Sequence, residues 1–306
     1  MTTPTRRAAL LGLGGAVALP GLARGQTTDD PFEGGIGGTG IVGVLTGLGS
    51  LRINGLRVEI DGRTRVTTPY GRVRVAALTP GLSLSIHADA RPGALRARDV
   101  AIDWALVGEM RRAGDGTWRV NGARVQPERG AVGRPVEGAR MAVSGLWTAG
   151  GVVASRFDPA PGDLDLIAGT AGRAAGGPTV GGVPITGAAP EPGRYAVVLG
   201  QGHGDGLAAD RVQIGRASFA RPLRQLAVEG YLEPVAARPG VRIAGLGHRF
   251  AADLDLAPFR GERAIYAGPY DGRFRPRAGW ILPEGVGARR LRLAGGLGPA
   301  AGRPAR

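Results

Sequence analysis

The sequence predicts an all-β protein composed of tandem small β-barrels, each built from five or so short strands. The chain has 306 residues, of which 56 are Gly and 23 are Pro, so about a quarter of it consists of turn-forming residues. Short apolar runs alternate with polar residues between these turns, and long segments with helical periodicity are absent. A pattern of roughly 60 residues also recurs four times along the chain, which indicates a repeat architecture.

Each repeat begins with two apolar residues and a glycine, although Glu229 separates the pair from the glycine in the fourth copy. A glycine within a strand permits the sharp bend that lets one strand join both halves of a small curled barrel. We therefore interpret four glycines as strand-bending positions, spaced by 65, 61 and 61 residues: Gly43, Gly108, Gly169 and Gly230.

A hairpin is predicted directly after the first strand of each repeat. The first two copies carry Asn54-Gly55 and Asn121-Gly122 between alternating apolar residues. Asn-Gly is the strongest short-range hairpin signal, because both turn residues need a positive φ. The four predicted hairpins span residues 51–58, 118–125, 179–185 and 241–246.

A second hairpin closes each predicted unit, and the fourth copy is the most divergent. Its predicted strands are 82–88 with 94–100, 141–145 with 152–157, 195–199 with 207–212, and 264–267 before a turn at Gly272. The predicted organisation is therefore a signal at 1–25, a linker at 26–36, barrel units at 37–104, 105–165, 166–226 and 227–290, and a flexible basic tail at 291–306.

Residues 1–25 have the three parts of an export signal: a positive start at Arg6 and Arg7, a weakly apolar stretch, and small residues at a cleavage site. The segment resembles a twin-arginine signal, and departs from that pattern at Ala9 and Leu11. The apolar stretch is too short to span a bilayer, and no later run reaches ~18 apolar residues, so no transmembrane segment is predicted. We expect the mature protein to be periplasmic or secreted.

The literal G-x-G-x-x-G at Gly35, Gly37 and Gly40 is not interpreted as a nucleotide-binding loop. Such a loop needs a strand before it and a helix after it, so that the pyrophosphate meets a helix N-terminus. Here the preceding residues are polar and the following residues are β-branched, which favours a strand. The glycines fit turns and strands instead, and no cofactor is expected.

The first repeat carries a pattern of glycine, serine and asparagine at Gly40, Gly43, Gly47, Gly49, Ser50, Asn54 and Gly55. In these residues the chain resembles a bacterial family of exported proteins of unknown function, the domain family numbered 5666. The match is strongest over 34–107, clear over 108–165 and weak beyond. The resemblance implies small OB-like β-barrels and export, and it implies no established activity.

The net charge of +14 favours acidic partners. Strand alternation places several arginines on outward faces, where they form a candidate basic surface. We expect an anionic envelope polymer or an acidic protein as the partner. The candidate binding residues are Arg52, Arg57, Arg96, Arg98, Arg119 and Arg124.

Nucleic acid is not the expected partner, although OB-like barrels often stack bases on exposed aromatic side chains. Trp104, Trp118, Trp147 and Tyr195 share strand faces with apolar residues, so they are predicted to lie in the core. No stacking surface is therefore apparent, and export also removes most nucleic acid from reach.

Residue chemistry gives little support to a metal site or to catalysis. Cysteine is absent, which excludes disulfides, zinc-thiolate sites and cysteine nucleophiles. His87 is expected on an outward face, His203 in a hairpin turn, and His248 beyond its turn without an identifiable partner. The acidic residues match no calcium-loop spacing. We expect a non-catalytic protein without metal ligands.

Two alternatives remain at this point. One is a periplasmic enzyme acting on polysaccharide, with carboxylates such as Asp163 or Asp165 at a unit boundary. The other is a protein whose role is assembly with the product of a neighbouring gene. A deep cleft with two facing carboxylates would favour the enzyme, and a convex arginine-rich surface without a pocket would favour the binding module.

Overall fold

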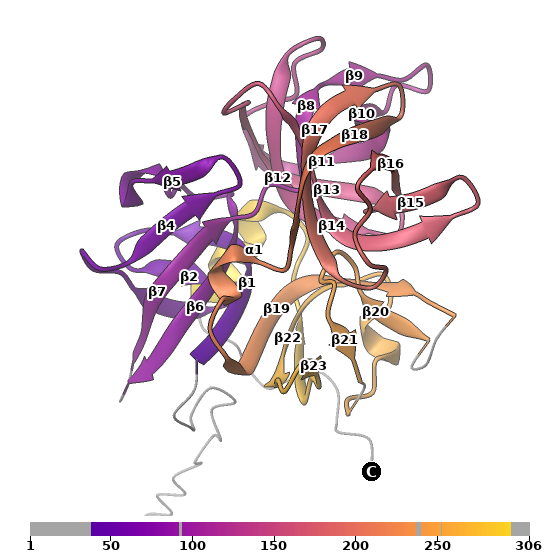
Figure 1. Cartoon of the computed structure of the whole chain (residues 1–306). Coiled ribbons are helices and arrows are strands. Elements are labelled where there is room, and N and C mark those ends of the chain that lie inside the picture. The colour runs from indigo at the N-terminus through magenta and orange to yellow at the C-terminus, as the bar shows by residue number, and fades with distance from the viewer. Residues whose placement is uncertain (1–37, 92–93, 237–239, 252, 295–306) are drawn as a thin grey trace, which may run out of the picture. The chain divides into compact units, whose positions relative to one another are not determined.

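The computed structural model describes residues 38–91, 94–236, 240–251 and 253–294 (Figure 1). By its internal contacts the chain divides into residues 1–30 and 31–306, and all described residues belong to the second part. The predicted signal and linker lie outside the described residues. The all-β prediction is confirmed, since strands account for nearly all regular structure.

The first ring is a closed five-stranded barrel, and its strands pair in the order β1-β2-β3-β7-β6 and back to β1. Only β3 and β7 are parallel, which gives the connectivity of an OB-like barrel. A further hairpin, β4 and β5, pairs with β7. The bounds are β1 (Gly38–Gly47), β2 (Leu51–Ile53), β3 (Leu56–Glu59), β4 (Arg65–Thr68), β5 (Gly71–Val73), β6 (Ser83–Arg91) and β7 (Ala94–Ile102).

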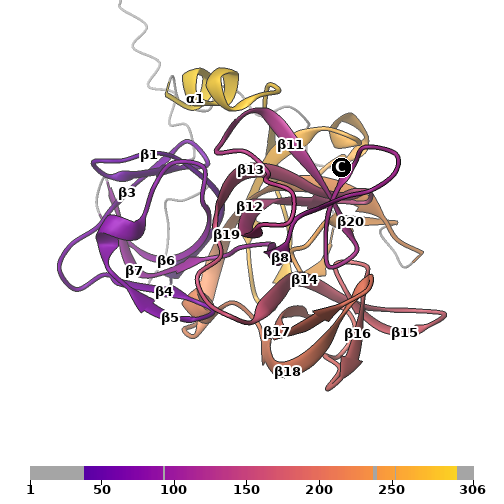
Figure 2. The ribbon, with the colours of Figure 1, turned by 90° about the horizontal axis from the view of Figure 1, so that it is seen from above.

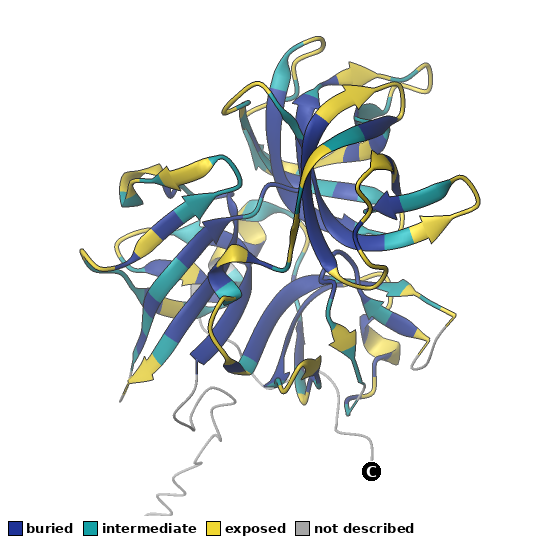
Figure 3. Cartoon of the chain, viewed as in Figure 1, coloured by how far each residue is buried: buried dark blue, intermediate teal, exposed yellow. Residues whose placement is uncertain are grey.

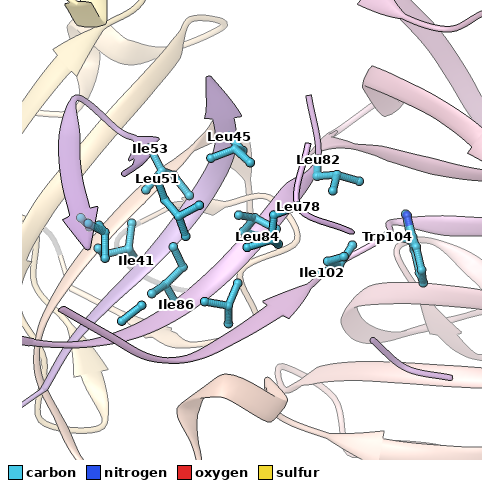
Figure 4. Close-up of a cluster of buried hydrophobic side chains, with 14 of the residues drawn as sticks. Ile41, Leu45, Leu51, Ile53, Leu78, Leu82, Leu84, Ile86, Ile102 and Trp104 are labelled. Atoms are coloured by element: carbon cyan, nitrogen blue, oxygen red, sulfur yellow. The ribbon is translucent and has the colours of Figure 1, made fainter. Parts of the chain in front are cut away.

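Alternating apolar residues fill this barrel, as strand periodicity requires (Figure 4). Ile41 of β1, Leu51 of β2 and Ile86 of β6 are completely buried and point into one cluster. The alternation is incomplete in one respect, because Ser85 and His87 on the other face of β6 are also buried. The outer face of β6 is therefore covered as well.

His87 lies on the outward face of β6, as expected, but that face is not exposed to solvent. The His87 side chain is buried, and burial lowers its pKa below the usual value. It packs so closely against β1 that a Cβ at Gly38 would lie 1.8 Å from His87 Nε2, which is a steric overlap. Period-two alternation identified the correct face of the strand, but it could not show that other parts of the chain cover that face.

The second ring follows the same strand order. Its first strand is interrupted only at Met110, so that β8 pairs with β12 and β9 pairs with β10. The parallel pair is β11 with β13. The bounds are β8 (Leu106–Glu109), β9 (Arg111–Arg112), β10 (Trp118–Val120), β11 (Ala123–Val132), β12 (Arg140–Thr148) and β13 (Gly151–Pro159).

The third ring is also closed, through pairing of β14 with both β15 and β17. Its parallel pair is β16 with β18. The bounds are β14 (Asp165–Ala174), β15 (Gly177–Val180), β16 (Val183–Gly187), β17 (Tyr195–His203) and β18 (Gly206–Ile214).

The fourth ring is open and keeps the strand order only in part, because β22 pairs with β19 and β24 and not with β23. The strand β19 pairs with β20 and β22, and the short strands β21 and β23 form the parallel pair. Within the described residues β20 and β21 do not pair, so the hairpin expected at 241–246 has only its first strand. The bounds are β19 (Leu223–Pro234), β20 (Val241–Ile243), β21 (Arg249–Phe250), β22 (Arg263–Pro269), β23 (Arg273–Phe274) and β24 (Ala278–Ile281).

The rings are joined through their first strands. The N-terminal half of β1 pairs in parallel with β19, and β8 pairs antiparallel with β14. Rings one and four thus share one sheet, and rings two and three share another. The four first strands β1, β8, β14 and β19 are largely buried. Figure 2 shows the rings from above, and Figure 3 shows that several hairpin tips are exposed. These pairings cover strand edges that would otherwise be open to other chains.

The predicted Asn-Gly turns are confirmed, with φ of 53° at Asn54 and 49° at Asn121. Each asparagine Nδ2 donates to the carbonyl just before the glycine of the first strand, at 2.9 Å and 3.2 Å. A Cβ at Gly43 would lie 2.1 Å from Asn54 Oδ1, and one at Gly108 would lie 2.9 Å from Asn121 Nδ2. These glycines make room for the asparagine side chain, a role beyond the strand bending inferred from sequence.

The helix α1 (Val286–Ala294) ends the described part of the chain. Residues 291–294 of the predicted flexible tail are its last turn, and the rest of the tail lies outside the described residues. Arg289 and Leu293, four residues apart on one helix face, are both buried. The sequence did not reveal this helix because its apolar stripe is short and interrupted by arginines.

A buried ion network ties α1 to three of the rings. Arg263 of β22 contacts Glu229 of β19 at 2.7 Å and Glu128 of β11 at 2.8 Å, and Arg289 contacts Glu128 at 2.6 Å. The other oxygen of Glu229 accepts from the Val44 amide of β1 at 2.8 Å. All four charged side chains are at most 5% exposed, and their charges cancel. The network therefore holds rings one, two and four in register.

We expect Gly43→Ala to lower the free energy of unfolding by about 1–3 kcal/mol or more, because the new methyl group overlaps Asn54 Oδ1. Urea denaturation measures the change. Gly114→Ala is the matched control, since a Cβ there meets nothing within 4 Å and no positive φ is involved. Equal effects of the two substitutions would contradict this role for Gly43.

We expect Glu229→Gln to cost about 3–5 kcal/mol, because it leaves buried arginine charge uncompensated. Chemical denaturation of the two purified proteins gives the difference. Glu109→Gln is the comparison, because Glu109 and its partner Arg111 are 45% and 63% exposed and such a pair contributes only about 0–1 kcal/mol. A small effect at Glu229 would show that the network contributes little to stability.

Candidate functional site

Two pairs of predicted binding arginines lie directly opposite each other on equivalent hairpins. Arg52 of β2 is in register with Arg57 of β3, and Arg119 of β10 is in register with Arg124 of β11. We call these four residues the hairpin arginines. Arg119 is half-buried and the other three are exposed. Within the described part of the chain, none of the four forms an ion pair with a carboxylate.

The other two predicted arginines differ in their electrostatic surroundings. Arg96 lies 3.4 Å from Asp61, and Arg98 is bonded to Asp89 at 2.5 Å. Both arginines belong to β7 and are half-buried. Their charge is thus largely balanced within the barrel, so the structure separates the six predicted residues into four hairpin arginines and two ion-paired ones.

A groove of about 820 Å³ with mixed charge lies between rings two and three. It brings together Arg119 and Asn121 of the second ring with Asp163, Asp165 and Asp205. The sequence singled out Asp163 and Asp165 as a candidate carboxylate pair, and the structure places both on this lining. We call it the mixed-charge groove.

Asp165 is tied into the structure of this groove. Its Oδ1 accepts a hydrogen bond from Arg140 at 2.7 Å, and its side chain is 14% exposed. A Cβ at Gly202 would lie only 2.4 Å from Asp165 Oδ2, so glycine is what leaves room for this carboxylate. Asp163 is exposed on the preceding loop. The two carboxylates therefore differ sharply in how they are held.

A second groove, of about 720 Å³, lies between rings three and four and is lined by four arginines. Arg194 precedes β17, Arg249 and Arg273 are in register on β21 and β23, and Arg275 follows β23. Asp271 is the only carboxylate on its lining, as far as the described residues go. We call this the arginine groove. Sequence reasoning missed it, because most of its residues come from the most divergent repeat and the others from the repeat before it.

Neutral aromatic groups form part of the arginine groove. His248 Nδ1 and Tyr270 Oη are 2.9 Å apart, and their rings meet edge to face at 5.3 Å. Burial, reinforced by Arg216 and Arg194, lowers the His248 pKa to about 3. The imidazole is therefore neutral at neutral pH. The buried His248 Nε2 has no hydrogen-bond partner among the described residues, and the same holds for Arg275 Nε.

A small cavity of about 50 Å³, with polar and apolar lining residues, lies where the rings meet. Arg216 lies over the Tyr195 ring at 3.7 Å, contacts Asp103 at 3.3 Å and donates to the Leu246 carbonyl at 2.8 Å. Burial raises the pKa of Asp103, while Arg216 and Ser85 act in the opposite direction. This volume suits water molecules and not an organic ligand. The cavity belongs to the junction between rings.

The aromatic residues lie largely as the sequence predicted. Trp104, Trp147 and Tyr195 are buried, and the Trp147 Nε1 donates to the Ala168 carbonyl at 2.7 Å across the boundary between rings two and three. Trp118 is half-buried beneath the Arg112 guanidinium, at 5.3 Å. None of these four side chains offers an open face for stacking a base.

Comparison with known proteins adds no family or function to this geometry. No family model, no curated protein and no solved structure matches the chain. In the part that the structure describes, no three His, Asp or Glu side chains gather as a possible metal site. Over the same residues, no helix has the length and apolarity needed to cross a membrane.

We expect protein stability to fall as the pH drops from about 6.5 towards 3, in part because of His248. Its pKa is lower in the folded than in the unfolded protein, so the unfolded state binds the extra proton in this window. One such group contributes a slope of at most about 1.4 kcal/mol per pH unit. Urea unfolding at pH 7, 5.5 and 4.5 measures the slope.

His248→Gln should make this dependence on pH shallower. The remaining slope includes contributions from His87, Asp61 and Asp115, whose pKa values are also lowered in the folded protein. His203→Gln, on the exposed tip of the β17–β18 hairpin, is the matched control. An unchanged slope in His248→Gln would contradict the assignment.

Proposed function

We propose that this chain is an exported, non-catalytic β-barrel repeat protein that serves as a binding or envelope-associated structural module. Its basic surface would contact an anionic envelope polymer or an acidic protein. Export is supported by the resemblance of residues 1–25 to a secretion signal, which indicates a periplasmic or secreted protein. The tandem barrels supply a rigid support for surface side chains.

The hairpin arginines carry this proposal. Like charges placed directly opposite each other on neighbouring strands are destabilising, and the chain places such a pair on the same hairpin of rings one and two. An anion bound across either pair relieves that repulsion. A guanidinium also matches the geometry of carboxylate and phosphate groups, which favours partners that carry those groups.

The repeat makes the two pairs equivalent in position. Each lies beside an Asn-Gly turn whose asparagine side chain is hydrogen-bonded to the first strand, which fixes the backbone that presents the arginines. Two equivalent sites on one chain can engage a polymer with repeated charges more tightly than either site alone. A polymeric partner therefore fits the arrangement better than a single small anion.

The alternative is a periplasmic enzyme acting on polysaccharide, and the mixed-charge groove is the feature that favours it. Asp163 and Asp165 line a groove large enough for a sugar unit. The hydrogen bond between Arg140 and Asp165 weighs against this alternative, since it already occupies one oxygen of the more buried carboxylate. Glycosidases use two carboxylates that are each free to act on substrate.

The binding proposal predicts that the protein is retained on cell-envelope fractions at low ionic strength and released as salt is added. Arg52→Gln with Arg57→Gln, or Arg119→Gln with Arg124→Gln, should weaken retention and flatten its salt dependence. Arg96→Gln with Arg98→Gln removes the same net charge from ion-paired positions and should have a smaller effect. A salt-gradient pull-down of the mature protein measures all three.

Retention that does not respond to ionic strength would remove the electrostatic proposal. Equal losses in all three double variants would show that net charge, and not the hairpin arginines, governs binding.

The enzyme alternative has its own test. Release of reducing ends from envelope polysaccharides by the wild-type protein, and its loss in Asp163→Asn, would favour the enzyme. Because Asp163 is exposed, this substitution should leave folding intact, and thermal unfolding provides the control.

A further inference from the structure

We propose that the arginine groove is a separate binding site for a compact ligand that carries two or more adjacent phosphate or carboxylate groups. The site is distinct from the hairpin arginines. Rings three and four form the groove, whereas the hairpin arginines belong to rings one and two. It would give the protein a specific small-anion ligand in addition to a polymeric partner.

Four guanidinium groups from three separate segments converge on this groove. Arg249 and Arg273 are directly in register on the parallel pair β21 and β23, so their side chains leave the sheet as neighbours. Arg275 follows on the same segment, and Arg194 approaches from the loop before β17. Convergence from distant parts of the sequence distinguishes this arrangement from a run of solvated charges.

The local carboxylates do not neutralise this cluster. Asp271 contacts Arg275 at 3.2 Å and also accepts from the backbone amide of Arg273 at 3.2 Å. Arg194 reaches Glu191 only at 4.0 Å, with both side chains more than half exposed, so that pair is weak. Arg249 and Arg273 form no ion pair within the described residues. The lining therefore carries an excess of positive charge with donors available to a ligand.

The shape and the polar lining also suit a small ligand. The volume of about 720 Å³ falls within the range of roughly 300–1,000 Å³ that small-molecule sites occupy. The Arg275 side chain is 44% exposed, so its guanidinium can contact a ligand oxygen. A Cβ at Gly193, Gly215 or Gly272 would meet nothing within 4 Å, so there is open space beside these three lining residues.

Adjacent anionic groups fit this site better than a single one. Cross-strand neighbours hold their Cβ atoms about 5 Å apart, so the Arg249 and Arg273 guanidiniums can each bind one group of the same ligand. Arg194 and Arg275 would contact the remaining oxygens. A guanidinium binds the oxygens of phosphate and carboxylate groups in the same bidentate way. The geometry therefore selects an anionic group of this kind without distinguishing phosphate from carboxylate.

Calorimetric titration of the mature protein at low salt tests the site, with tripolyphosphate, citrate and inorganic phosphate as probes. We expect saturable one-to-one binding of tripolyphosphate or citrate and much weaker binding of inorganic phosphate. The tighter of the first two probes identifies phosphate or carboxylate chemistry. Arg249→Gln with Arg273→Gln should weaken binding about tenfold or more.

The matched control is Arg52→Gln with Arg57→Gln, a pair that is likewise exposed and in register. It removes the same charge and should change the affinity less than about twofold. Both double variants remove repulsion between like charges, so neither should unfold the protein, and thermal unfolding checks this. Equal losses in the two variants, or no saturable binding of any probe, would overturn the proposal.

Histidine resonances in NMR spectra place the ligand independently. His248 lines the groove, so its ring signals should shift during the titration, while those of His203 on the distant exposed hairpin should not. The reverse pattern would contradict the site. This inference and the proposed function can fail separately, because polymer retention depends on the hairpin arginines and small-anion binding depends on Arg249 and Arg273.

Discussion

The buried ion network of Glu128, Glu229, Arg263 and Arg289 is the constraint on which the arrangement of the rings depends. Its members come from the second ring, the fourth ring and the C-terminal helix, and Glu229 also binds the first strand of the first ring. Buried charges tolerate few alternative partners, because any unpaired member is costly. A shift of one ring against another would leave such a charge uncompensated. Apolar packing between barrels would allow more registers than this network does.

The local elements could be predicted because their signals are local. Alternation and glycine-containing turns identified the hairpins of the first three repeats. The turn conformation at Asn54 and Asn121 follows from chemistry within two residues. The pairing between rings could not be predicted in this way. The outer edge of β1 has the same composition whether it meets β19 or solvent, and the burial of His87 depends on segments far away in sequence.

The sequence did contain one signal for the ion network. The apolar pair and glycine are adjacent in the first three repeats, whereas Glu229 is inserted between them in the fourth. A charged residue inside a predicted buried strand indicates a buried partner, and Arg263 is that partner.

The net charge predicted a basic surface, but it could not show where on the molecule the unpaired arginines lie. Asp61 and Asp89 partly neutralise β7, and the arginine groove depends on the parallel pairing of β21 with β23.

The parallel pairing of β1 with β19 has a consequence for the newly made chain. Val44 and Glu229, which meet at this junction, are 185 positions apart. The entropy lost in closing so long a loop grows only slowly with its length, so the finished fold tolerates the separation. On the ribosome, however, β1 emerges long before β19 exists, and its edge stays open during most of translation. An open edge of this kind invites pairing with other nascent chains, so the first barrel needs protection until its last partner strand has been synthesised.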